Sequence, residues 1–373
     1  MTGKSVQKGA AASISRRHAL GLGGAALGAA LAAPSVARSE NARVSWKMVT
    51  SWPRNLPGPG VTAQRISDRV AAMSGGAFQI RLYAAGELVP ALGVFDAVSA
   101  GTVQMGHTAS FFWQGKIPAS VFFTAIPFGL VPIEHLTWIE QGGGQALWEE
   151  LYAPFNIKPV MAGNTGIQMG GWFKREIASL DDIGGLTIRM PGLGGEVMRR
   201  LGGTPVSLPP GEIYQALQTG VIDAAEFLGP WSDRAMGFQK ITKNYYTPGF
   251  HEPNGTGEAL FHQPAFDALP SDFQSVLLEA CRAENAFALT ESEWENAGSL
   301  VALQQQDGVV VRDYPADVLA RLREISGDVL AEFAEKDPVS RQILDSYQSA
   351  RARLSPWSDV SLRRFFRARD KPA

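Results

Sequence analysis

The sequence predicts an α/β protein of two lobes, with mixed, mostly parallel sheets, strands that cross between the lobes and a long helical C-terminal region. One pattern occurs twice: an apolar helical face from Phe95 ends at Gly101, and 119 residues further on a similar face from Tyr214 ends at Gly220. A short alternating strand follows each glycine, which makes one helix-to-strand unit. Two such units indicate two similar lobes. From Ser271 to Arg367 the apolar spacing is helical almost throughout.

The first part of the chain alternates strand and helix patterns. This order predicts a mostly parallel sheet that is covered on both faces. The loop of residues 51–60 holds three prolines and two glycines. In order, the predicted elements are a strand at Val44 to Thr50, a helix at Gly60 to Met73, a strand at Ala77 to Tyr83, a helix at Leu88 to Gly101 and a strand at Val103 to Thr108.

The middle of the chain contains the predicted crossings between lobes. Residues 113–130 are rich in aromatics and prolines, which predicts loops and short turns, and a helix with a break near Gly142 is expected over residues 137–152. The strand-like run of residues 158–174 carries many glycines, a pattern that marks close approach of a ligand or another backbone. It is predicted to cross to the second lobe, and residues 222–228 to cross back.

These elements predict a division of the chain into domains. We expect residues 44–162 and 229–270 to form the first lobe and residues 163–228 the core of the second. The helical region of residues 271–373 is expected to brace both lobes or to pair with a second subunit, with breaks at residues 307–315, near Pro338 and near Pro356.

Residues 1–37 are predicted to be a twin-arginine export signal that directs the protein to the periplasm. Ser15, Arg16 and Arg17 precede an apolar, uncharged run from Ala19 to Ala33, and small residues at positions 35–37 suit a signal-peptidase site. Fifteen apolar residues are fewer than the roughly 20 needed to span a bilayer, which disfavours a membrane anchor. The mature protein is expected to be soluble.

Composition and charge exclude several classes of function. The chain of 373 residues is 45% hydrophobic and 19% charged, which is ordinary for a globular protein. Without the predicted signal it holds 30 Lys and Arg against 36 Asp and Glu, a net charge of −6, whereas nucleic-acid binders are usually basic. Cys281 is the only cysteine, which excludes an intramolecular disulfide and a cysteine-ligated cluster, and its helical apolar neighbours predict a buried thiol.

Arg189 is the sharpest candidate for binding a ligand. It ends the probable strand of residues 186–191, and ligands of α/β sheets are usually bound at the carboxyl ends of strands. A guanidinium matches a carboxylate with two parallel hydrogen bonds, so a small anion is the expected ligand. The alternative is a surface arginine paired with Glu196 or Asp181.

Glu226 is a candidate metal ligand. It directly follows the second repeated unit, and its carboxylate would repel an anion in the same cleft unless a cation compensated it. Oxygens from Glu226, the amide of Gln168 and a backbone carbonyl near Phe227 would suit a hard cation such as sodium or calcium. The alternative is an exposed carboxylate at a strand end.

Further residues complete the candidate ligand-binding set. Asn164 and Gln168 lie four residues apart, so in an extended segment their side chains share a face. Aromatic walls with a few polar groups are typical of small-molecule pockets, although for any single aromatic residue a place in the core is the more common role. The candidate substrate-binding residues are Arg189, Asn164, Gln168, Phe227, Trp231 and Glu252.

The sequence contains no clear catalytic constellation, and no catalytic residue is predicted. His107, Glu252, Glu258 and His262 lack zinc-site spacing such as His-Glu-x-x-His, and no Gly-x-Ser-x-Gly nucleophile motif occurs. The glycines from Gly192 to Gly195 lack the third glycine of a dinucleotide-binding motif.

The chain resembles the substrate-binding proteins of tripartite ATP-independent periplasmic (TRAP) transporters. The resemblance covers essentially the whole mature chain and is carried by the motifs at residues 163–172, 188–192 and 223–230, the first and third of which resemble the branch that binds 2-oxo acids. It implies a two-lobed periplasmic-binding-protein fold that closes on an organic anion and delivers it to membrane permease subunits. Some members of the branch form homodimers through a long C-terminal helix.

The resemblance also implies roles for individual residues. Arg189 would hold the ligand carboxylate, Asn164 would touch the ligand, and Gln168, Glu226 and the carbonyl of Phe227 would hold a bridging sodium or calcium ion. The chain departs from the family pattern at residues 251–257, where His251 replaces an expected aromatic residue and residues 253–256 look inserted.

The sequence therefore predicts a periplasmic receptor, not an enzyme, for a small 2-oxo or 2-hydroxy monocarboxylate. One alternative is a receptor for a dicarboxylate or a sugar acid, which would need another cationic side chain in the cleft. The other is an exported enzyme that acts on a carboxylic acid with Glu226 as its base.

Overall fold

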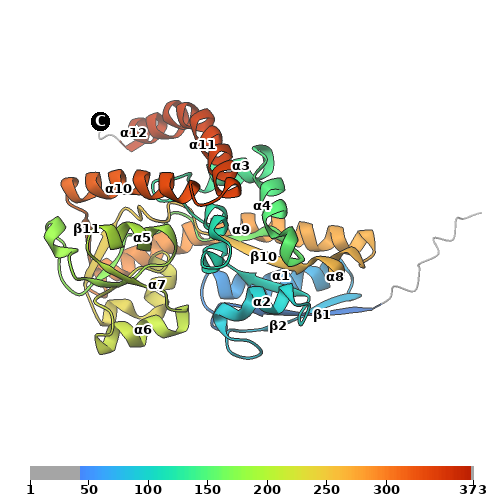
Figure 1. Cartoon of the computed structure of the whole chain (residues 1–373). Helices are drawn as coiled ribbons and strands as arrows, with labels where there is room; N and C mark the ends of the chain where they lie inside the picture. The colour runs from blue at the N-terminus through green and yellow to red at the C-terminus, as the bar shows by residue number, and fades with distance from the viewer. Residues whose placement is uncertain (1–42, 371–373) are drawn as a thin grey trace, which may run out of the picture. The chain divides into compact units, whose positions relative to one another are not determined.

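The computed structural model describes residues 43–370 and contains two mixed β-sheets with helices packed around each, as the fold class predicted (Figure 1). The predicted export signal lies outside the described residues. In the first sheet the strand order is β2-β1-β3-β10-β4, and β10 runs antiparallel to both of its neighbours. Its strands are β1 (Val44–Thr50), β2 (Phe78–Tyr83), β3 (Met105–Thr108), β4 (Ile157–Asn164) and β10 (Thr256–His262).

Helices cover both faces of the first sheet because successive strand residues point to opposite sides. Met48 packs in the core under α1 and α9, whereas its neighbour Val49 packs in a separate core with residues of α2. A Cβ at Gly106 would lie 2.7 Å from a methyl group of Val94, so α2 rests directly on β3. The helices around this sheet are α1 (Pro59–Met73), α2 (Val94–Ser99), α3 (Pro132–Gln141), α4 (Gly144–Tyr152), α8 (Gln263–Asp267) and the first part of α9 (Ser271–Gln305).

The second sheet has the strand order β11-β9-β5-β8-β6-β7. Adjacent aromatics again separate two cores: Trp172 and Tyr245 pack on one face, and Phe173 and Tyr246 on the other. Its strands are β5 (Gly171–Phe173), β6 (Thr187–Arg189), β7 (Thr204–Val206), β8 (Ala224–Ala225), β9 (Asn244–Thr247) and β11 (Val310–Asp313), and its helices include α5 (Gly192–Arg200), α6 (Pro210–Thr219) and α7 (Pro230–Met236).

The chain returns to the first sheet later than the sequence indicated. Residues 224–225 form the short strand β8 inside the second sheet, and β9 still belongs to that sheet, so the return to β10 follows Thr247. The alternation of residues 222–228 marks a buried strand but does not reveal which strands pair with it. Residues 229–270 were expected in the first lobe: β9 within that range pairs in the second sheet, whereas β10 lies in the first.

The C-terminal region is helical except for β11, which occupies the predicted break at residues 307–315 and pairs with β9. The helices are α10 (Ala316–Ala334), α11 (Pro338–Ser358) and α12 (Arg364–Asp370), with α10 against α5 and α11 against α3 and α4. The predicted break near Pro356 is wrong. Pro356 lies inside α11, and the turns widen to a π-helix only over Asp359–Arg363, because a proline removes one N–H donor without necessarily ending a helix.

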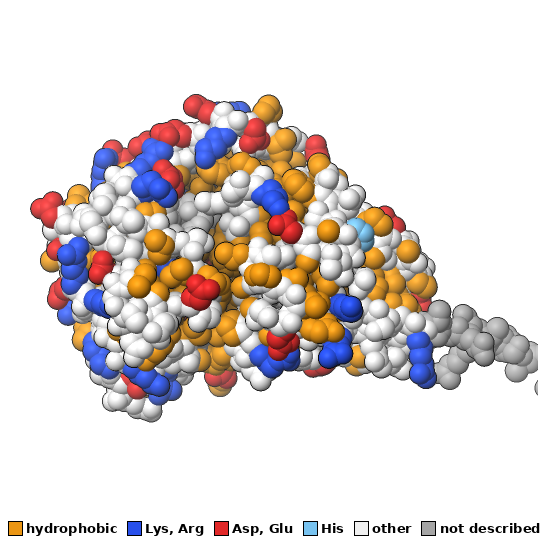
Figure 2. Space-filling model, turned by 60° about the horizontal axis from the view of Figure 1, so that its bottom comes forward, with side chains coloured by type: hydrophobic (Ala, Val, Ile, Leu, Met, Phe, Trp, Pro, Cys, Tyr) orange, Lys and Arg blue, Asp and Glu red, His pale blue; other side chains and the backbone are white. Residues whose placement is uncertain are grey.

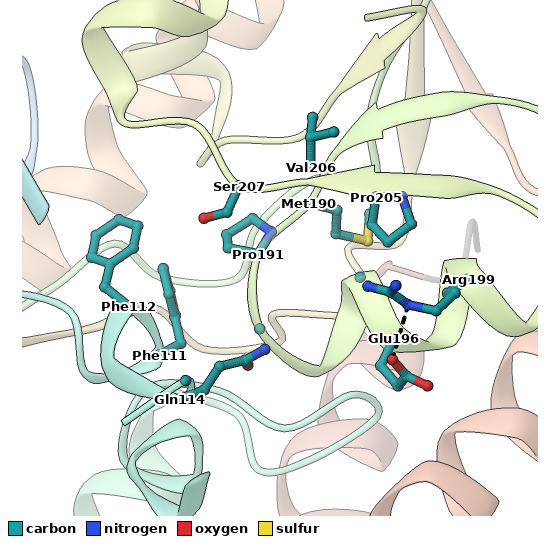
Figure 3. Close-up of a pocket in the computed structure, with 13 residues that line it drawn as sticks. Phe111, Phe112, Gln114, Met190, Pro191, Glu196, Arg199, Pro205, Val206 and Ser207 are labelled. Carbon is teal, nitrogen blue, oxygen red and sulfur yellow. Dashed lines mark hydrogen bonds and ion pairs between the residues drawn. The ribbon is translucent and has the colours of Figure 1, made fainter. Parts of the chain in front are cut away.

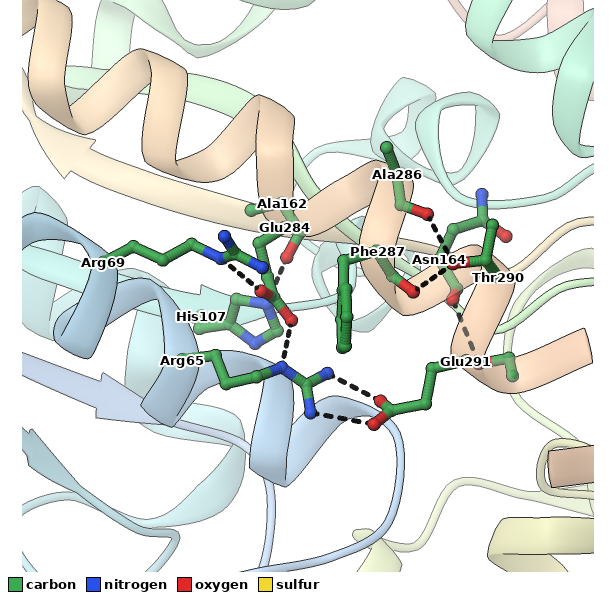
Figure 4. A network of polar contacts seen from close by, with 11 residues as sticks. Arg65, Arg69, His107, Ala162, Asn164, Glu284, Ala286, Phe287, Thr290 and Glu291 are labelled. Atoms are coloured by element: carbon green, nitrogen blue, oxygen red, sulfur yellow. Dashed lines mark hydrogen bonds and ion pairs between the residues drawn. The ribbon is translucent and has the colours of Figure 1, made fainter. Parts of the chain in front are cut away.

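An ion-pair network ties α1 to α9 (Figure 4). Nε of Arg65 and Nε of Arg69 lie 2.6 and 2.8 Å from the two carboxylate oxygens of Glu284, whose side chain is fully buried. Arg65 also pairs with Glu291 at 2.7 Å, and its guanidinium lies over the ring of Phe287. A buried carboxylate is stable only when its charge is compensated in this way. On the same helix, Cys281 is buried in the core as predicted.

Surface features agree with the composition. Figure 2 shows hydrophobic side chains gathered towards the middle of one face, with charged side chains of both signs around them. Among residues 43–370, no helix combines the length and the apolarity needed to cross a membrane.

Candidate functional site

The parallel pairing of β6 with β8 places Arg189 beside Glu226. Arg189 lies opposite Ala225 in the sheet register, so the residue after β8 emerges next to the arginine at the ends of both strands. Nη1 of Arg189 donates hydrogen bonds to Oε1 of Glu226 at 2.6 Å and to the carbonyl oxygen of Glu226 at 2.9 Å. Arg189 is 2% exposed and Glu226 is 0% exposed. Arg189 therefore does not form the surface pair with Glu196 or Asp181, and Glu226 is not an exposed carboxylate.

The guanidinium keeps donor capacity for a ligand. Within the described residues, its hydrogen bonds use Nη1 and Nε, the latter donating to the carbonyl of Leu208 at 3.3 Å. Its Cζ lies 5.7 Å from the centre of the Phe227 ring, so an aromatic face supports the cation. Nη2 can therefore donate to an anion without breaking the bonds that hold the side chain.

A cluster of buried ionisable groups surrounds Glu226. Nε2 of His251 lies 3.0 Å from Oε2 of Glu226, and Glu226, His251 and Glu252 each offer an oxygen or nitrogen atom within 4.8 Å of the others. Burial, and next the charge of Glu226, raise the pKa of Glu252 well above its ordinary value, while Arg189 opposes the shift. Two carboxyl groups this close and this dry cannot both ionise cheaply without a cation.

One oxygen at the site has no partner. Oε1 of Gln168 is buried without a hydrogen bond from any described residue, while its Nε2 donates to the hydroxyl of Thr165 at 3.1 Å. A buried amide oxygen in this state lacks the interaction that offsets its lost hydration. An oxygen acceptor of this kind next to a carboxylate is the donor set that hard cations bind.

Some of these residues line a small cavity of about 30 Å³. Its lining includes the predicted residues Gln168, Arg189, Phe227 and Glu252, and among the lining residues Arg189 is the only lysine or arginine. Apolar walls come from Trp52, Phe111 and Phe112. The site can therefore hold a small solute with one anionic end and a short apolar end.

Three of the predicted residues do not line the cavity: Glu226, which pairs with Arg189, and Asn164 and Trp231. Asn164 is buried, donates to Oδ1 of Asn254 at 2.8 Å and accepts from the backbone N–H of Gly166 at 2.9 Å, so its side chain holds the crossing segments together. The backbone N–H of Trp231 donates to Asn296 of α9. Neither residue is among those that line the cavity.

Sequence reasoning missed the support behind Trp52. Its indole N–H donates to Nδ1 of His107 at 2.8 Å, and Nε2 of His107 bonds the carbonyl of Ala162 at 2.9 Å, which assigns the proton to Nε2. Burial lowers the pKa of His107 to about 4, so the imidazole is neutral. The sequence indicated His251 only as a departure from a family pattern. His251 and Glu252 are adjacent ionisable residues that follow the aromatic-rich residues 245–250, and this was a usable signal of a site.

A second, larger hollow lies next to the cavity (Figure 3). Its volume is about 270 Å³, and it shares Phe111 and Phe112 with the lining of the smaller cavity. Met190, Pro191 and Gly192, which directly follow Arg189 in the chain, line its other side.

Comparison with known proteins agrees with this geometry. The model of the family described as bacterial extracellular solute-binding protein, family 7, matches residues 49–337. A monocarboxylate 2-oxoacid-binding periplasmic protein of Nostoc sp. is 42% identical over 318 residues, which covers 85% of this chain and 87% of that protein.

Two solved structures are similar in sequence and fold. A TRAP periplasmic solute-binding protein from Pseudoalteromonas atlantica with bound sodium and pyruvate is 38% identical, with a TM-score of 0.85 over 87% of this chain and 98% of that one. A TRAP transporter solute-binding protein from Bordetella bronchiseptica, a mixed-occupancy dimer with calcium and picolinate, is 36% identical, with a TM-score of 0.85 over 87% and 96%. The chain therefore belongs to family 7 of the bacterial extracellular solute-binding proteins, among the TRAP transporter solute-binding proteins.

Proposed function

We propose that this protein is a periplasmic receptor that binds a small 2-oxo or 2-hydroxy monocarboxylate together with a sodium or calcium ion and delivers it to TRAP membrane subunits. The observation that carries the proposal is the buried Arg189–Glu226 pair beside the unpartnered oxygen of Gln168. The 2-oxoacid-binding relative from Nostoc and the pyruvate complex from Pseudoalteromonas support the same ligand class.

In this proposal Arg189 binds the ligand carboxylate. Charge-assisted hydrogen bonds contribute about 1.5 to 3 kcal/mol each when they are shielded from water. The pairing with Glu226 and the bond to Leu208 fix the guanidinium before the ligand arrives, so little side-chain entropy is lost on binding.

The cation would be held by Oε1 of Gln168, the carboxylate of Glu226 and the carbonyl of Phe227. The residues fit such an ion because Gln168 presents a buried, unpartnered oxygen and all three ligands are oxygens. Arg189 already compensates the charge of Glu226, so an anionic ligand adds a negative charge that the ion would offset. We propose sodium in preference to calcium. The related structures include an example of each ion.

The small size of the cavity favours a monocarboxylate over the alternatives. A dicarboxylate or sugar acid needs a second cationic group, and Arg189 is the only lysine or arginine in the cavity lining. An exported enzyme with Glu226 as its base is disfavoured because the proteins that the chain resembles are solute-binding proteins.

Calorimetry tests the proposal. The purified protein is treated with a chelator, dialysed into potassium buffer and titrated with pyruvate, 2-oxobutyrate, lactate and succinate, with sodium, with calcium or with neither added. We expect binding of the monocarboxylates that strengthens when one of the ions is present, and much weaker binding of succinate. Absence of heat for every acid under all three conditions would refute the proposal.

We also propose that the protein is exported by a twin-arginine signal.

We further propose that the protein forms a homodimer through its C-terminal segment. Large apolar side chains near the end of the chain are exposed, which monomeric proteins usually avoid in a contiguous group. These are Trp357, Val360, Leu362, Phe365 and Phe366. The related Bordetella structure is a dimer, which supports this assembly.

A further inference from the structure

Two aromatic rings separate the small cavity at Arg189 from the larger hollow beside it. Phe111 and Phe112 line both spaces, of about 30 and 270 Å³. Their ring centres lie 4.6 Å apart in an edge-to-face arrangement, and Phe112 also contacts Trp52 at 6.1 Å between ring centres. Figure 3 shows both rings facing Pro191 across the hollow.

The short helix that carries the two rings, Ser110–Trp113, is anchored at both ends. The backbone N–H of Ser110 donates to the hydroxyl of Thr124 at 2.9 Å, and the indole N–H of Trp113 donates to Oε1 of Glu258 at 2.8 Å. Phe111 and Phe112 lie between these anchors and are only half-buried. The flanking residues thus fix the backbone of the wall, and both rings also pack against the neighbouring apolar cores.

The wall meets the second lobe at the backbone of Gly192. A Cβ at that position would lie 3.6 Å from the Cβ of Phe111, an ordinary van der Waals contact. Gly192, which begins α5 three residues after Arg189, lines the hollow, so this contact lies on the hollow's side of the wall.

The direction of a ligand follows from the polarity of the lining. The guanidinium of Arg189 would hold the carboxylate and, in the proposed function, a cation bound by Gln168 and Glu226 would hold the 2-oxo oxygen, so the carbon chain of a 2-oxo acid must face the apolar residues. The apolar side of the lining includes Trp52, Phe111 and Phe112. The first methylene groups beyond the 2-oxo carbon would therefore point at the rings.

We propose that Phe111 and Phe112 limit the length of the 2-oxo acid that the receptor accepts, and that the hollow behind them takes the alkyl chain of a longer acid when a ring is removed. This inference rests on the proposed function. The hollow suits an alkyl chain because Met190, Pro191 and Val206 line it, while its charged residues, Glu196 and Arg199, pair with each other.

The test compares acids of increasing length on single-ring variants. Pyruvate, 2-oxobutyrate, 2-oxohexanoate and 2-oxooctanoate are titrated calorimetrically into the wild type, Phe111→Ala and Phe112→Ala, in the ion that supports pyruvate binding best. Phe287→Ala is the matched control, because this exposed ring on α9 lines neither space.

We expect the ratio of the Kd for 2-oxohexanoate to the Kd for pyruvate to fall at least tenfold in one or both variants. Burial of each additional methylene group strengthens binding about fourfold, and this acid carries three more than pyruvate. The ratio in Phe287→Ala should match the wild type. Phe111→Leu and Phe112→Leu, which keep part of the wall, should give intermediate ratios.

Two results would overturn the length limit. The first is pyruvate binding by both alanine variants with an unchanged ratio. The second is loss of pyruvate binding in folded variants, which would make the rings part of the binding surface itself. Failure of the wild type to bind any of the four acids would instead overturn the proposed function, and the length limit with it.

Discussion

Arg189 and Glu226 form an ion pair that has lost its contact with water. Desolvation of each charge is costly, and removal of one partner leaves the other buried and uncompensated. The informative substitutions at this site therefore keep the charge and change the geometry. His251 adds a third group, because its Nε2 bonds the carboxylate oxygen that Arg189 leaves free.

Replacement of Arg189 by lysine is expected to weaken acid binding about 100-fold with a small effect on folding. A lysine keeps the positive charge beside Glu226 but loses the planar fork that binds a carboxylate with two parallel bonds. Calorimetry with pyruvate and thermal melting measure the two effects. Arg199→Lys, on the exposed face of α5, is the control, and pyruvate affinity within threefold of wild type in Arg189→Lys would contradict the role of the guanidinium.

Replacement of Gln168 by glutamate is expected to shift the cation preference towards calcium. A second negatively charged oxygen ligand favours a divalent ion, because affinity for Ca²⁺ rises with the charge of its ligands. The ratio of pyruvate affinity in calcium to that in sodium should rise at least tenfold, and calcium should raise the melting temperature more than in the wild type. An unchanged ratio would remove Gln168 from the proposed cation site.

At the level of elements, the crossing segments and the C-terminal helices organise the molecule. The loop between β9 and β10 brings His251 and Glu252 to the strand ends of the second sheet, while Asn254 joins it to Asn164 after β4. Residues from widely separated stretches of chain thereby meet at one cavity. The end of the chain differs, since large apolar side chains between Trp357 and Phe366 are exposed.

The exposed C-terminal side chains lead to a prediction about assembly. Trp357 is 67% exposed and Phe365 is 60% exposed, so replacing both by glutamate removes apolar surface without disturbing the core. We expect light scattering to show that the double variant is a monomer. Its melting temperature should be close to that of the wild type when the wild type is dissociated into monomers. Val221→Glu, an equally exposed position after α6, should leave the assembly unchanged. A dimer that survives the double substitution would place the interface elsewhere.

At the scale of the whole molecule, buried carboxyl groups determine how stability depends on pH. Burial raises the pKa of Glu258 to about 8, against hydrogen bonds from Trp113 and Tyr152, and raises the pKa of Asp233 to about 6. Both acids therefore hold protons in the folded state that the unfolded chain releases. The stabilisation that these two groups contribute is greatest below their unfolded pKa values near 4. It is lost as the pH rises through their folded pKa values.

Between pH 6.5 and 7.5 Glu258 should contribute to this loss, together with Glu252, whose pKa burial also raises well above its ordinary value. One group that is protonated only in the folded state lowers the free energy of unfolding by at most about 1.4 kcal/mol per pH unit. Urea unfolding across this range should show a shallower pH dependence in Glu258→Gln, which keeps an acceptor for the indole of Trp113. The exposed control Glu150→Gln should follow the wild type. Equal slopes in all three proteins would show that Glu258 is ionised in the folded state.

The sequence alone determined the elements that have a strong local pattern. The strand Val44–Thr50, the end of α6 at Gly220 and the position of Arg189 at a strand end all follow from periodicity and punctuation, because these record which face of a segment is buried. The motifs around residues 163–172, 188–192 and 223–230 were sufficient to identify the family.

Only the tertiary structure decided which segments meet. That Glu226 pairs with Arg189 and His251, that Asn164 holds the framework and that Phe111 and Phe112 divide two spaces depend on strand order and on the late return of the chain after β9. Local periodicity carries no information on these matters, because the energy of a buried charge or ring depends on partners that are distant in the chain.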